Sequence, residues 1–298
     1  MLSIIVCSRS KELSESFIDN IRSTIGVEHE IIAIDNSDNR NTIFSAYNKG
    51  FELSSFPIVC FIHDDVLFHT DNWGQKIIKH LEQPKCGIIG FAGGSLVSRI
   101  PASWSSFFSA ISIIQSDRAG RKPSRVIIRP DKFDQERQPV VLLDGVFLGM
   151  KRELMEKIKF DETISGFHSY DLDISLQSII AGHTNFVIYD IKLEHFSRGN
   201  RDATYYRNMI TVFKKWEAYL PLKGLSLTKF EIDDIPGIEF SALNRFTKEL
   251  IRKGFSTSEI IEETLYYSNK IQVRTTSFRV KFKIVFIRLI SCPKYLMR

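Results

Sequence analysis

Three short apolar runs alternate with two helix-like segments at the start of the chain, and this pattern limits the fold more than any other feature. The runs are Leu2 to Cys7, Glu30 to Ile34 and Ile58 to Ile62. Leu13 to Ile25 and Asn41 to Leu53 lie between them, and their length and apolar spacing predict helices. Continuous apolar strands are typical of a parallel sheet that helices cover on both faces. The pattern predicts a βαβαβ unit and a Rossmann-like α/β fold with a mixed, mostly parallel sheet.

Further elements continue this pattern. We expect strands at Gly87 to Phe91, Val140 to Leu143 and Phe186 to Tyr189, and helices at Lys151 to Ile158, Tyr170 to Ala181, Asp202 to Tyr219 and Ser256 to Tyr267. The segment from Pro101 to Pro139 is rich in Ser, Arg and Pro, and this composition predicts a long loop. Pro221 and Gly224 interrupt the helical pattern, so we predict a main domain over residues 1–220 and a mostly helical extension over 221–298.

Polar residues follow each of the first three strands. They are Ser8-Arg9, Asp35-Asn36-Ser37 and His63-Asp64-Asp65. Parallel sheets bind ligands beyond the carboxyl ends of their strands, so we expect these groups to lie close together. Two adjacent carboxylates after an apolar strand favour a divalent cation, although a solvated loop or a helix N-cap is an alternative. No glycine-rich dinucleotide fingerprint or Walker loop follows the first strand.

The order of several motifs resembles glycosyltransferase family 2, the inverting enzymes with the GT-A fold, over residues Ser3 to about Tyr219. The matching segments are Ile31-Ile32-Ala33-Ile34-Asp35, Ala46-Tyr47-Asn48-Lys49-Gly50, Phe61-Ile62-His63-Asp64-Asp65, Leu143-Asp144-Gly145-Val146-Phe147, Gly166 to Asp173, and Glu194 to Gly199. The fourth looks like the family's acceptor-side strand, and the third occupies the place of its Asp-x-Asp motif. The resemblance implies a GT-A domain.

The resemblance also implies roles for individual residues. The metal ligands are Asp65 and His195, with Mn²⁺ or Mg²⁺ as the ion, and Asp171 is the catalytic base that accepts the acceptor's proton. Some residues are expected on the nucleotide-sugar side because they lie at the strand ends, and others because they match the family's motifs. Together they are Ser8, Arg9, Asp35, Asn48, His63, Asp64 and Arg198. The residues expected on the acceptor side are Asp144, Gly145 and Asp173.

Two residues depart from the family pattern. His63 replaces the first Asp of Asp-x-Asp, and Tyr170 replaces the Glu of Glu-Asp. If the register slips by two residues, Asp173 rather than Asp171 faces the acceptor, because residues two apart point about 200° apart around a helix.

The function that follows is the transfer, with inversion, of a hexose or deoxyhexose from a UDP-, GDP- or dTDP-linked donor to a glycan, a lipid-linked acceptor or another hydroxyl. This activity belongs to polysaccharide biosynthesis. A nucleotidyltransferase and a non-catalytic nucleotide-sugar or glycan binding module are the alternatives. The absence of a glycine-rich basic loop argues against the former, whereas the two departures keep the latter open.

The charge distribution and the cysteines predict where in the cell the protein acts. The formal net charge of +5 does not indicate nucleic acid, but the residues after Lys270 include Lys and Arg and no Asp or Glu. Phe278 to Leu289 fits either a basic amphipathic helix on an anionic membrane or a segment that packs on the main domain or a partner subunit in a homodimer. The four scattered cysteines and the absence of a leader-like start predict a cytoplasmic protein, peripheral at the inner face of the membrane.

Overall fold

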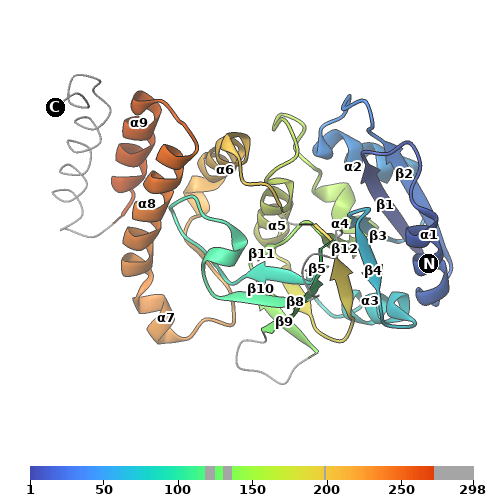
Figure 1. Cartoon of the computed structure of the whole chain (residues 1–298). Helices are drawn as coiled ribbons and strands as arrows, with labels where there is room; N and C mark the ends of the chain where they lie inside the picture. The colour runs from blue at the N-terminus through green and yellow to red at the C-terminus, as the bar shows by residue number, and fades with distance from the viewer. Residues whose placement is uncertain (118–124, 130–135, 198, 272–298) are drawn as a thin grey trace. The chain divides into compact units, whose positions relative to one another are not determined.

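The computed structural model describes residues 1–117, 125–129, 136–197 and 199–271, except for the side chains of residues 127–129. Its main sheet has seven strands in the order β10-β13-β5-β12-β3-β1-β2 (Figure 1). Their bounds are β1 Leu2–Ser8, β2 His29–Asp35, β3 Ile58–Ile62, β5 Cys86–Gly90, β10 Arg137–Val140, β12 Phe147–Lys151 and β13 Thr184–Ile188. Strands β2, β1, β3, β5 and β13 run in one direction, and β12 and β10 run antiparallel to their neighbours. The predicted α/β fold with a mixed, mostly parallel sheet is confirmed.

Helices cover both faces of this sheet, which explains the continuous apolar strands. They are α1 Glu15–Thr24, α2 Ile43–Leu53, α3 Trp73–Leu81, α4 Arg152–Lys157 and α5 Tyr170–Ile180. On one face, Val6 shares a core cluster with Phe17 of α1 and Trp73 of α3. On the other face α2 approaches β1 so closely that a Cβ at Gly50 would lie 2.3 Å from Cγ2 of Ile5. Glycine is therefore required at this point in α2.

A second sheet includes part of the segment where the sequence predicts a loop. Its path is β11-β6-β8-β14-β4, with β9 paired to β8, and its strands are β4 Val66–Phe68, β6 Ala92–Gly94, β8 Ser109–Gln115, β9 Arg125–Arg129, β11 Leu142–Leu143 and β14 Leu193–His195. The prediction of a long loop over residues 101–139 is wrong, because β8, β9 and most of β10 lie there. Ser109 and Ser112 interrupt the apolar residues of β8, which dilutes the hydrophobic pattern, and pairing with β6 and β14 stabilises the strand. The predicted strand at Val140 to Leu143 is divided between β10 and β11.

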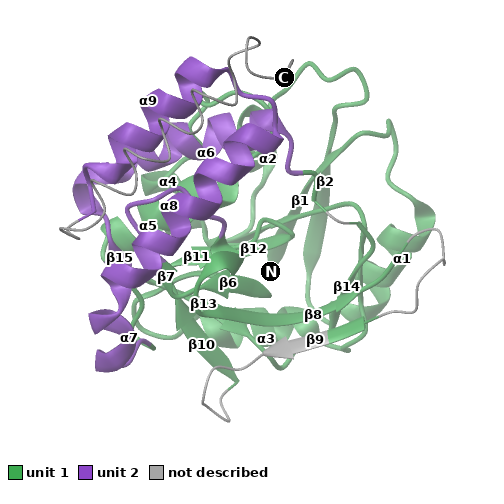
Figure 2. Ribbon diagram, turned by 60° about the vertical axis from the view of Figure 1, so that its left-hand side comes forward, with its two compact units in different colours: residues 1–96, 104–200, 223–226 green, residues 97–103, 201–222, 227–298 purple. Residues whose placement is uncertain are grey.

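The chain forms two compact units, which Figure 2 shows in different colours. The first comprises residues 1–96, 104–200 and 223–226, and the second comprises residues 97–103, 201–222 and 227–298. The remaining elements are α6 Ala203–Trp216, α7 Lys229–Asp233, α8 Ile235–Arg252, α9 Thr257–Ser268, β7 Leu96–Val97, β15 Leu222–Lys223 and the 3₁₀ turns Trp104–Ser106 and Glu217–Tyr219. The two later helices predicted from sequence correspond to α6 and α9. The division at residue 220 stays a prediction.

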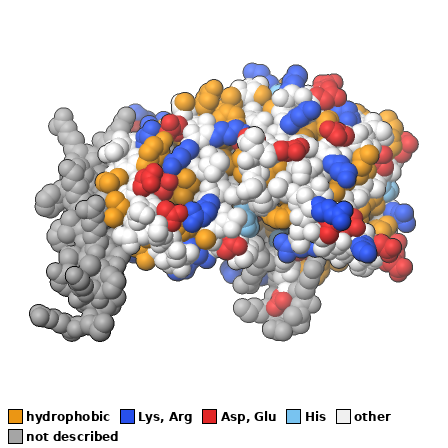
Figure 3. Space-filling view, turned by 90° about the horizontal axis from the view of Figure 1, so that it is seen from above, with side chains coloured by type: hydrophobic (Ala, Val, Ile, Leu, Met, Phe, Trp, Pro, Cys, Tyr) orange, Lys and Arg blue, Asp and Glu red, His pale blue; other side chains and the backbone are white. Residues whose placement is uncertain are grey.

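The surface carries both signs of charge. In Figure 3, Lys and Arg side chains are interspersed with Asp and Glu side chains over the described residues of that face. Among the described residues, no helix is both long and apolar enough to cross a membrane. Cys7, Cys60 and Cys86 are free thiols. The basic segment at Phe278 to Leu289 lies outside the described residues.

Candidate active site

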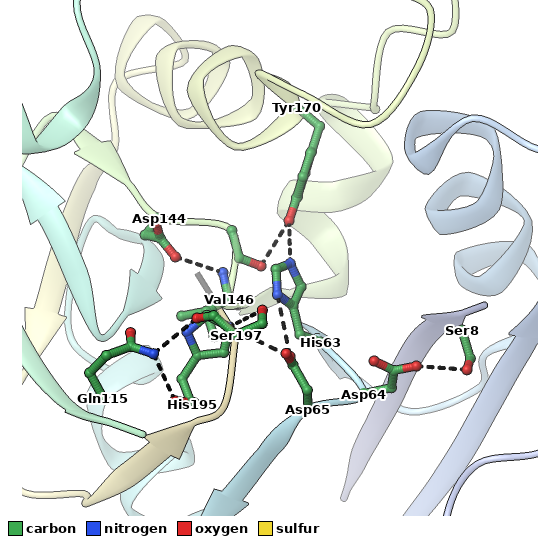
Figure 4. Close-up of polar contacts among 11 residues, drawn as sticks. Ser8, His63, Asp64, Asp65, Gln115, Asp144, Val146, Tyr170, His195 and Ser197 are labelled. Carbon is green, nitrogen blue, oxygen red and sulfur yellow. Dashed lines mark hydrogen bonds and ion pairs between the residues drawn. The ribbon is translucent and has the colours of Figure 1, made fainter. Parts of the chain in front are cut away.

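The loops after β1, β2 and β3 meet at one edge of the main sheet. The Ser8 hydroxyl donates a hydrogen bond of 2.7 Å to Oδ2 of Asp64, which joins the end of β1 to the loop after β3 (Figure 4). The backbone N–H of Asn36 donates to the carbonyl of Ser8 at 2.8 Å, which joins β2 to the same place. The parallel arrangement thus brings the three polar strand ends together, as expected from the sequence.

Three side chains at this edge form a candidate metal site. Oδ1 of Asp65 lies 3.8 Å from Nδ1 of His63 and 3.5 Å from Nε2 of His195. Among the described residues, these three form a group whose potential ligand atoms all lie within 4.8 Å of one another. One carboxylate oxygen and two imidazole nitrogens form a donor set that suits a divalent transition metal such as Mn²⁺. His63, predicted to contact the nucleotide sugar, therefore lies within this cluster.

Strand pairing places His195 beside Asp65. Strand β14 runs antiparallel to β4 and sets His195 opposite Val66, and the N–H of Phe196 donates to the Asp65 carbonyl at 3.0 Å. The Gln115 amide donates to the carbonyls of His195 at 3.0 Å and Ser197 at 2.9 Å. Sequence reasoning missed Gln115 because it lies in the segment predicted to be a loop.

The surroundings of Asp65 keep its carboxylate ionised. The residue is 8% exposed, and this burial raises its pKa. Hydrogen bonds from His195 and Ser197 outweigh burial and hold the pKa of Asp65 below its ordinary value. An ionised, largely desolvated carboxylate is the form that binds a cation.

The two residues that depart from the family pattern contact each other. Nε2 of His63 lies 2.9 Å from the Tyr170 hydroxyl, which donates to the Gly145 carbonyl at 3.0 Å (Figure 4). Tyr170 begins α5, and its ring packs edge-on against Tyr47 and Phe44 at centroid distances of 5.6 and 6.3 Å. The sequence shows Tyr170 as a departure but does not show that His63 is its partner.

Gly145→Ala is expected to displace Tyr170. A Cβ at residue 145 would lie 2.1 Å from the Tyr170 oxygen and 2.4 Å from its Cζ. Because the packed ring has little room to move, we expect a loss of about 1–3 kcal/mol in the free energy of unfolding, measured with urea. Gly199→Ala is the matched control, since its Cβ would meet no atom of the described residues within 4 Å. Equal unfolding midpoints for the two variants would contradict this packing.

Asp171, the predicted base, lies beside Asp144. Its carboxylate accepts hydrogen bonds from the N–H groups of Gly145 at 3.1 Å and Leu172 at 2.9 Å. Burial, followed by the nearby charge of Asp144, raises the pKa of Asp171 to about 7. Asp144 accepts from the N–H of Val146 at 3.0 Å and from Nε1 of Trp104 at 2.7 Å, a partner that lies in the predicted loop and that the sequence did not indicate.

Two other predicted site residues have different surroundings. Asp173 is 1% exposed and accepts a hydrogen bond of 2.8 Å from Gln177, one turn later in α5. Asp171 is partly exposed, and which of the two carboxylates meets an acceptor stays a prediction. The Asn48 amide donates to the Phe160 carbonyl and to Glu162, both at 2.8 Å, and accepts from the Phe160 N–H at 3.2 Å. These contacts join α2 to the segment at Phe160 and Glu162. The place of Asn48 in a nucleotide pocket stays a prediction.

The remaining predicted residues lie around the strand ends. Asp35 is exposed, and hydrogen bonds from Ser37 lower its pKa. The Arg9 guanidinium lies 5.9 Å from the centroid of the Phe167 ring. Arg198 lies outside the described residues. The nucleotide-sugar roles of Arg9, Asp35 and Arg198 stay predictions.

Comparisons with known proteins agree with this geometry. A protein-family profile described as "Glycosyltransferase like family" matches residues 3–215. The mannosyltransferase PcManGT from Pyrobaculum calidifontis, in complex with GDP-Man and Mn²⁺, has a similar structure, with a TM-score of 0.51 and 13% identity over 96% of this chain and 87% of that chain. GalNAc-T7 with UDP, GalNAc and Mn²⁺ gives a TM-score of 0.53 and 10% identity, and the match covers 98% of this chain and 58% of that chain. No curated protein sequence matches significantly.

The identities to the two solved structures are low, so these structures support the fold alone. The family match is broader evidence, because residues 3–215 are most of the 298-residue chain and include the metal cluster and Asp171. The chain therefore belongs to the glycosyltransferase-like family and has the GT-A fold.

Proposed function

We propose that this chain is an inverting, metal-dependent glycosyltransferase that moves a hexose or deoxyhexose from a UDP-, GDP- or dTDP-linked donor to a hydroxyl acceptor. One observation carries the proposal. The cluster of His63, Asp65 and His195 is linked through Tyr170 and Gly145 to Asp171, a carboxyl group whose pKa is raised to about 7. An ion-binding group and a base next to each other are what transfer from a diphosphate donor requires.

The metal cluster is proposed to hold the donor. His63, Asp65 and His195 would bind a divalent ion, which when bound supplies positive charge to stabilise the leaving diphosphate. The solved structures of PcManGT with GDP-Man and of GalNAc-T7 with UDP both contain Mn²⁺, which supports this choice of ion and donor class. Ser8 holds Asp64 by a hydrogen bond, so the loop that carries Asp65 is tied to the first strand.

Asp171 is proposed to act on the acceptor. Its carboxylate would take the proton from the acceptor hydroxyl while that oxygen forms a bond to the anomeric carbon and the bond to the diphosphate oxygen breaks. The proton stays on Asp171, and the nucleoside diphosphate leaves. A single displacement of this kind inverts the configuration at the anomeric carbon. The charge of Asp144 raises the pKa of Asp171, and the Gly145 N–H donates a hydrogen bond to the Asp171 carboxylate, which supports their placement on the acceptor side.

The cellular setting is a further part of the proposal. We place the enzyme in polysaccharide biosynthesis at the cytoplasmic face of a membrane, with a glycan or a lipid-linked acceptor. The basic charges after Lys270 support peripheral contact with an anionic surface, and a homodimer is an alternative use of this segment.

Calorimetric titration tests the donor and metal parts of the proposal. We expect one of UDP, GDP and dTDP to bind, with an affinity that rises when Mn²⁺ is present, and we expect slow hydrolysis of the matching donor sugar. Binding that does not depend on the ion would contradict the metal site. Metal-dependent binding with no hydrolysis and no transfer to any hydroxyl acceptor would instead support a binding module.

The transfer rate is expected to depend on pH near neutrality. A base works when it is deprotonated, and the pKa of Asp171 is raised to about 7. The rate should therefore fall as the pH is lowered from about 8 to 6, below which most Asp171 is protonated. Asp144→Asn removes the neighbouring charge, so the fall in transfer rate should occur at a lower pH. A flat profile across this range in steady-state assays at saturating donor would exclude Asp171 as the base.

A further inference from the structure

We propose that Tyr170 is the positioning residue that sets which nitrogen of His63 faces the metal ion. The inference rests on the proposed function, because it concerns the metal site of that reaction. It explains the two departures from the family pattern together, since a histidine in place of the first Asp needs a partner that fixes its ring. The observations that support it are the directions of the hydrogen bonds around the Tyr170 hydroxyl.

The Tyr170 hydroxyl has one hydrogen and two lone pairs. The Gly145 carbonyl, 3.0 Å away, can accept but cannot donate, so it takes the phenolic hydrogen. The two lone pairs that remain can only accept. His63, whose Nε2 lies 2.9 Å away, must therefore donate to one of them as an N–H group.

This assignment fixes the tautomer of neutral His63. With the hydrogen on Nε2, the other nitrogen, Nδ1, carries a lone pair. Nδ1 lies 3.8 Å from Oδ1 of Asp65, an oxygen that is itself an acceptor. A lone pair directed at a carboxylate is unfavourable unless a cation lies between them. The arrangement is suited to an ion bound by Nδ1 of His63, Oδ1 of Asp65 and Nε2 of His195.

The second nitrogen ligand also affects which ion binds. Mg²⁺ prefers oxygen ligands, whereas imidazole nitrogens favour transition metals. An aspartate at position 63 would give two carboxylates and one imidazole, a donor set closer to what Mg²⁺ accepts. His63 held by Tyr170 therefore makes the site select Mn²⁺ over Mg²⁺.

The test uses Mn²⁺ alone with the full-length protein. Binding is followed by loss of the electron paramagnetic resonance signal of free Mn²⁺, and the His63 tautomer is read from ¹⁵N NMR of the metal-free protein. In the wild type we expect saturable binding and the Nε2–H form. Tyr170→Phe should lower Mn²⁺ affinity by about 10- to 100-fold, as loss of an outer-shell partner does, and should increase the Nδ1–H form.

Tyr47→Phe is the matched control, because it removes a buried hydroxyl from the same cluster without removing the group that holds His63. A clearly smaller loss of affinity than in Tyr170→Phe supports the inference. An equal loss in the two variants overturns it, as does an Nδ1–H form in the wild type or an unchanged affinity in Tyr170→Phe.

A second variant keeps the inference testable if Tyr170→Phe folds poorly. His63→Asp should bind Mg²⁺ relatively better, so the ratio of Mn²⁺ to Mg²⁺ affinity falls, and an unchanged ratio overturns the role of His63. Failure of the wider function would look different. If the wild type binds no Mn²⁺, both proposals fail. If it does bind and Asp65→Ala abolishes that binding, but the Tyr170 and His63 variants behave like the wild type, this inference alone is wrong.

Discussion

Asp65→Ala is expected to abolish Mn²⁺ binding and to lower the rate of sugar transfer by roughly 10³-fold. Asp65 is the shared member of the metal cluster, since its Oδ1 is the atom near both His63 and His195. A Lewis acid contributes several kcal/mol to stabilising the leaving diphosphate, and about 4 kcal/mol corresponds to a factor of 10³. Titration with Mn²⁺ and a transfer assay at fixed donor concentration measure the two effects.

Asp64→Ala is the matched control for metal binding. It removes the same group from the adjacent position, where the carboxylate accepts a hydrogen bond from Ser8 at 2.7 Å. We expect the Asp64 variant to keep most of its Mn²⁺ affinity, although its donor affinity can change. Asp65→Asn keeps the shape of the side chain, and its thermal melting temperature shows whether the fold survives loss of the carboxylate. Similar Mn²⁺ affinities for Asp65→Ala and wild type would remove the basis for the metal site.

Local patterns were sufficient to predict the core of the fold. Strand β1 alternates between faces, with Val6 packed below α1 and Ile5 packed below α2, so a continuous apolar run indicated a sheet covered on both sides. Strand β8 could not be predicted in this way. Its serines weaken the apolar period, and besides its neighbours β6 and β9 it pairs with β14, which is distant in sequence. The β-strand propensity of single residues does not predict pairing between strands that are distant in sequence.

The same limit applies to the site. Asp65 and His195 could be predicted as a pair because each belongs to a motif with a recognisable order along the chain. The bond between His63 and Tyr170 could not, since the two residues lie 107 positions apart and neither motif specifies the other. The Trp104 contact with Asp144 was also missed, since Trp104 has no periodic neighbours to mark it. Ordered motifs predict which residues form a site, whereas contacts between unlike motifs require the structure.

Asp171→Asn is expected to lower kcat by about 10²- to 10⁴-fold, the usual contribution of a general base, while Mn²⁺ and donor affinities stay close to those of the wild type. The amide has nearly the same shape but cannot take a proton from the acceptor hydroxyl. Steady-state kinetics with the acceptor varied, together with calorimetry for the donor, separate the two effects. A kcat close to that of the wild type would exclude Asp171 as the base.

Stability distinguishes a lost base from a damaged fold. Burial raises the pKa of Asp171 from its ordinary value of 3.8 to about 7, so the folded state holds this proton more tightly than the unfolded state. Stability from this group therefore falls as the pH rises between about 4 and 7. At pH 8 the asparagine variant, which has no charge to bury, should melt no lower than the wild type. Asp173→Asn tests the alternative register. If that variant, and not Asp171→Asn, loses turnover while it still binds donor, the base is Asp173.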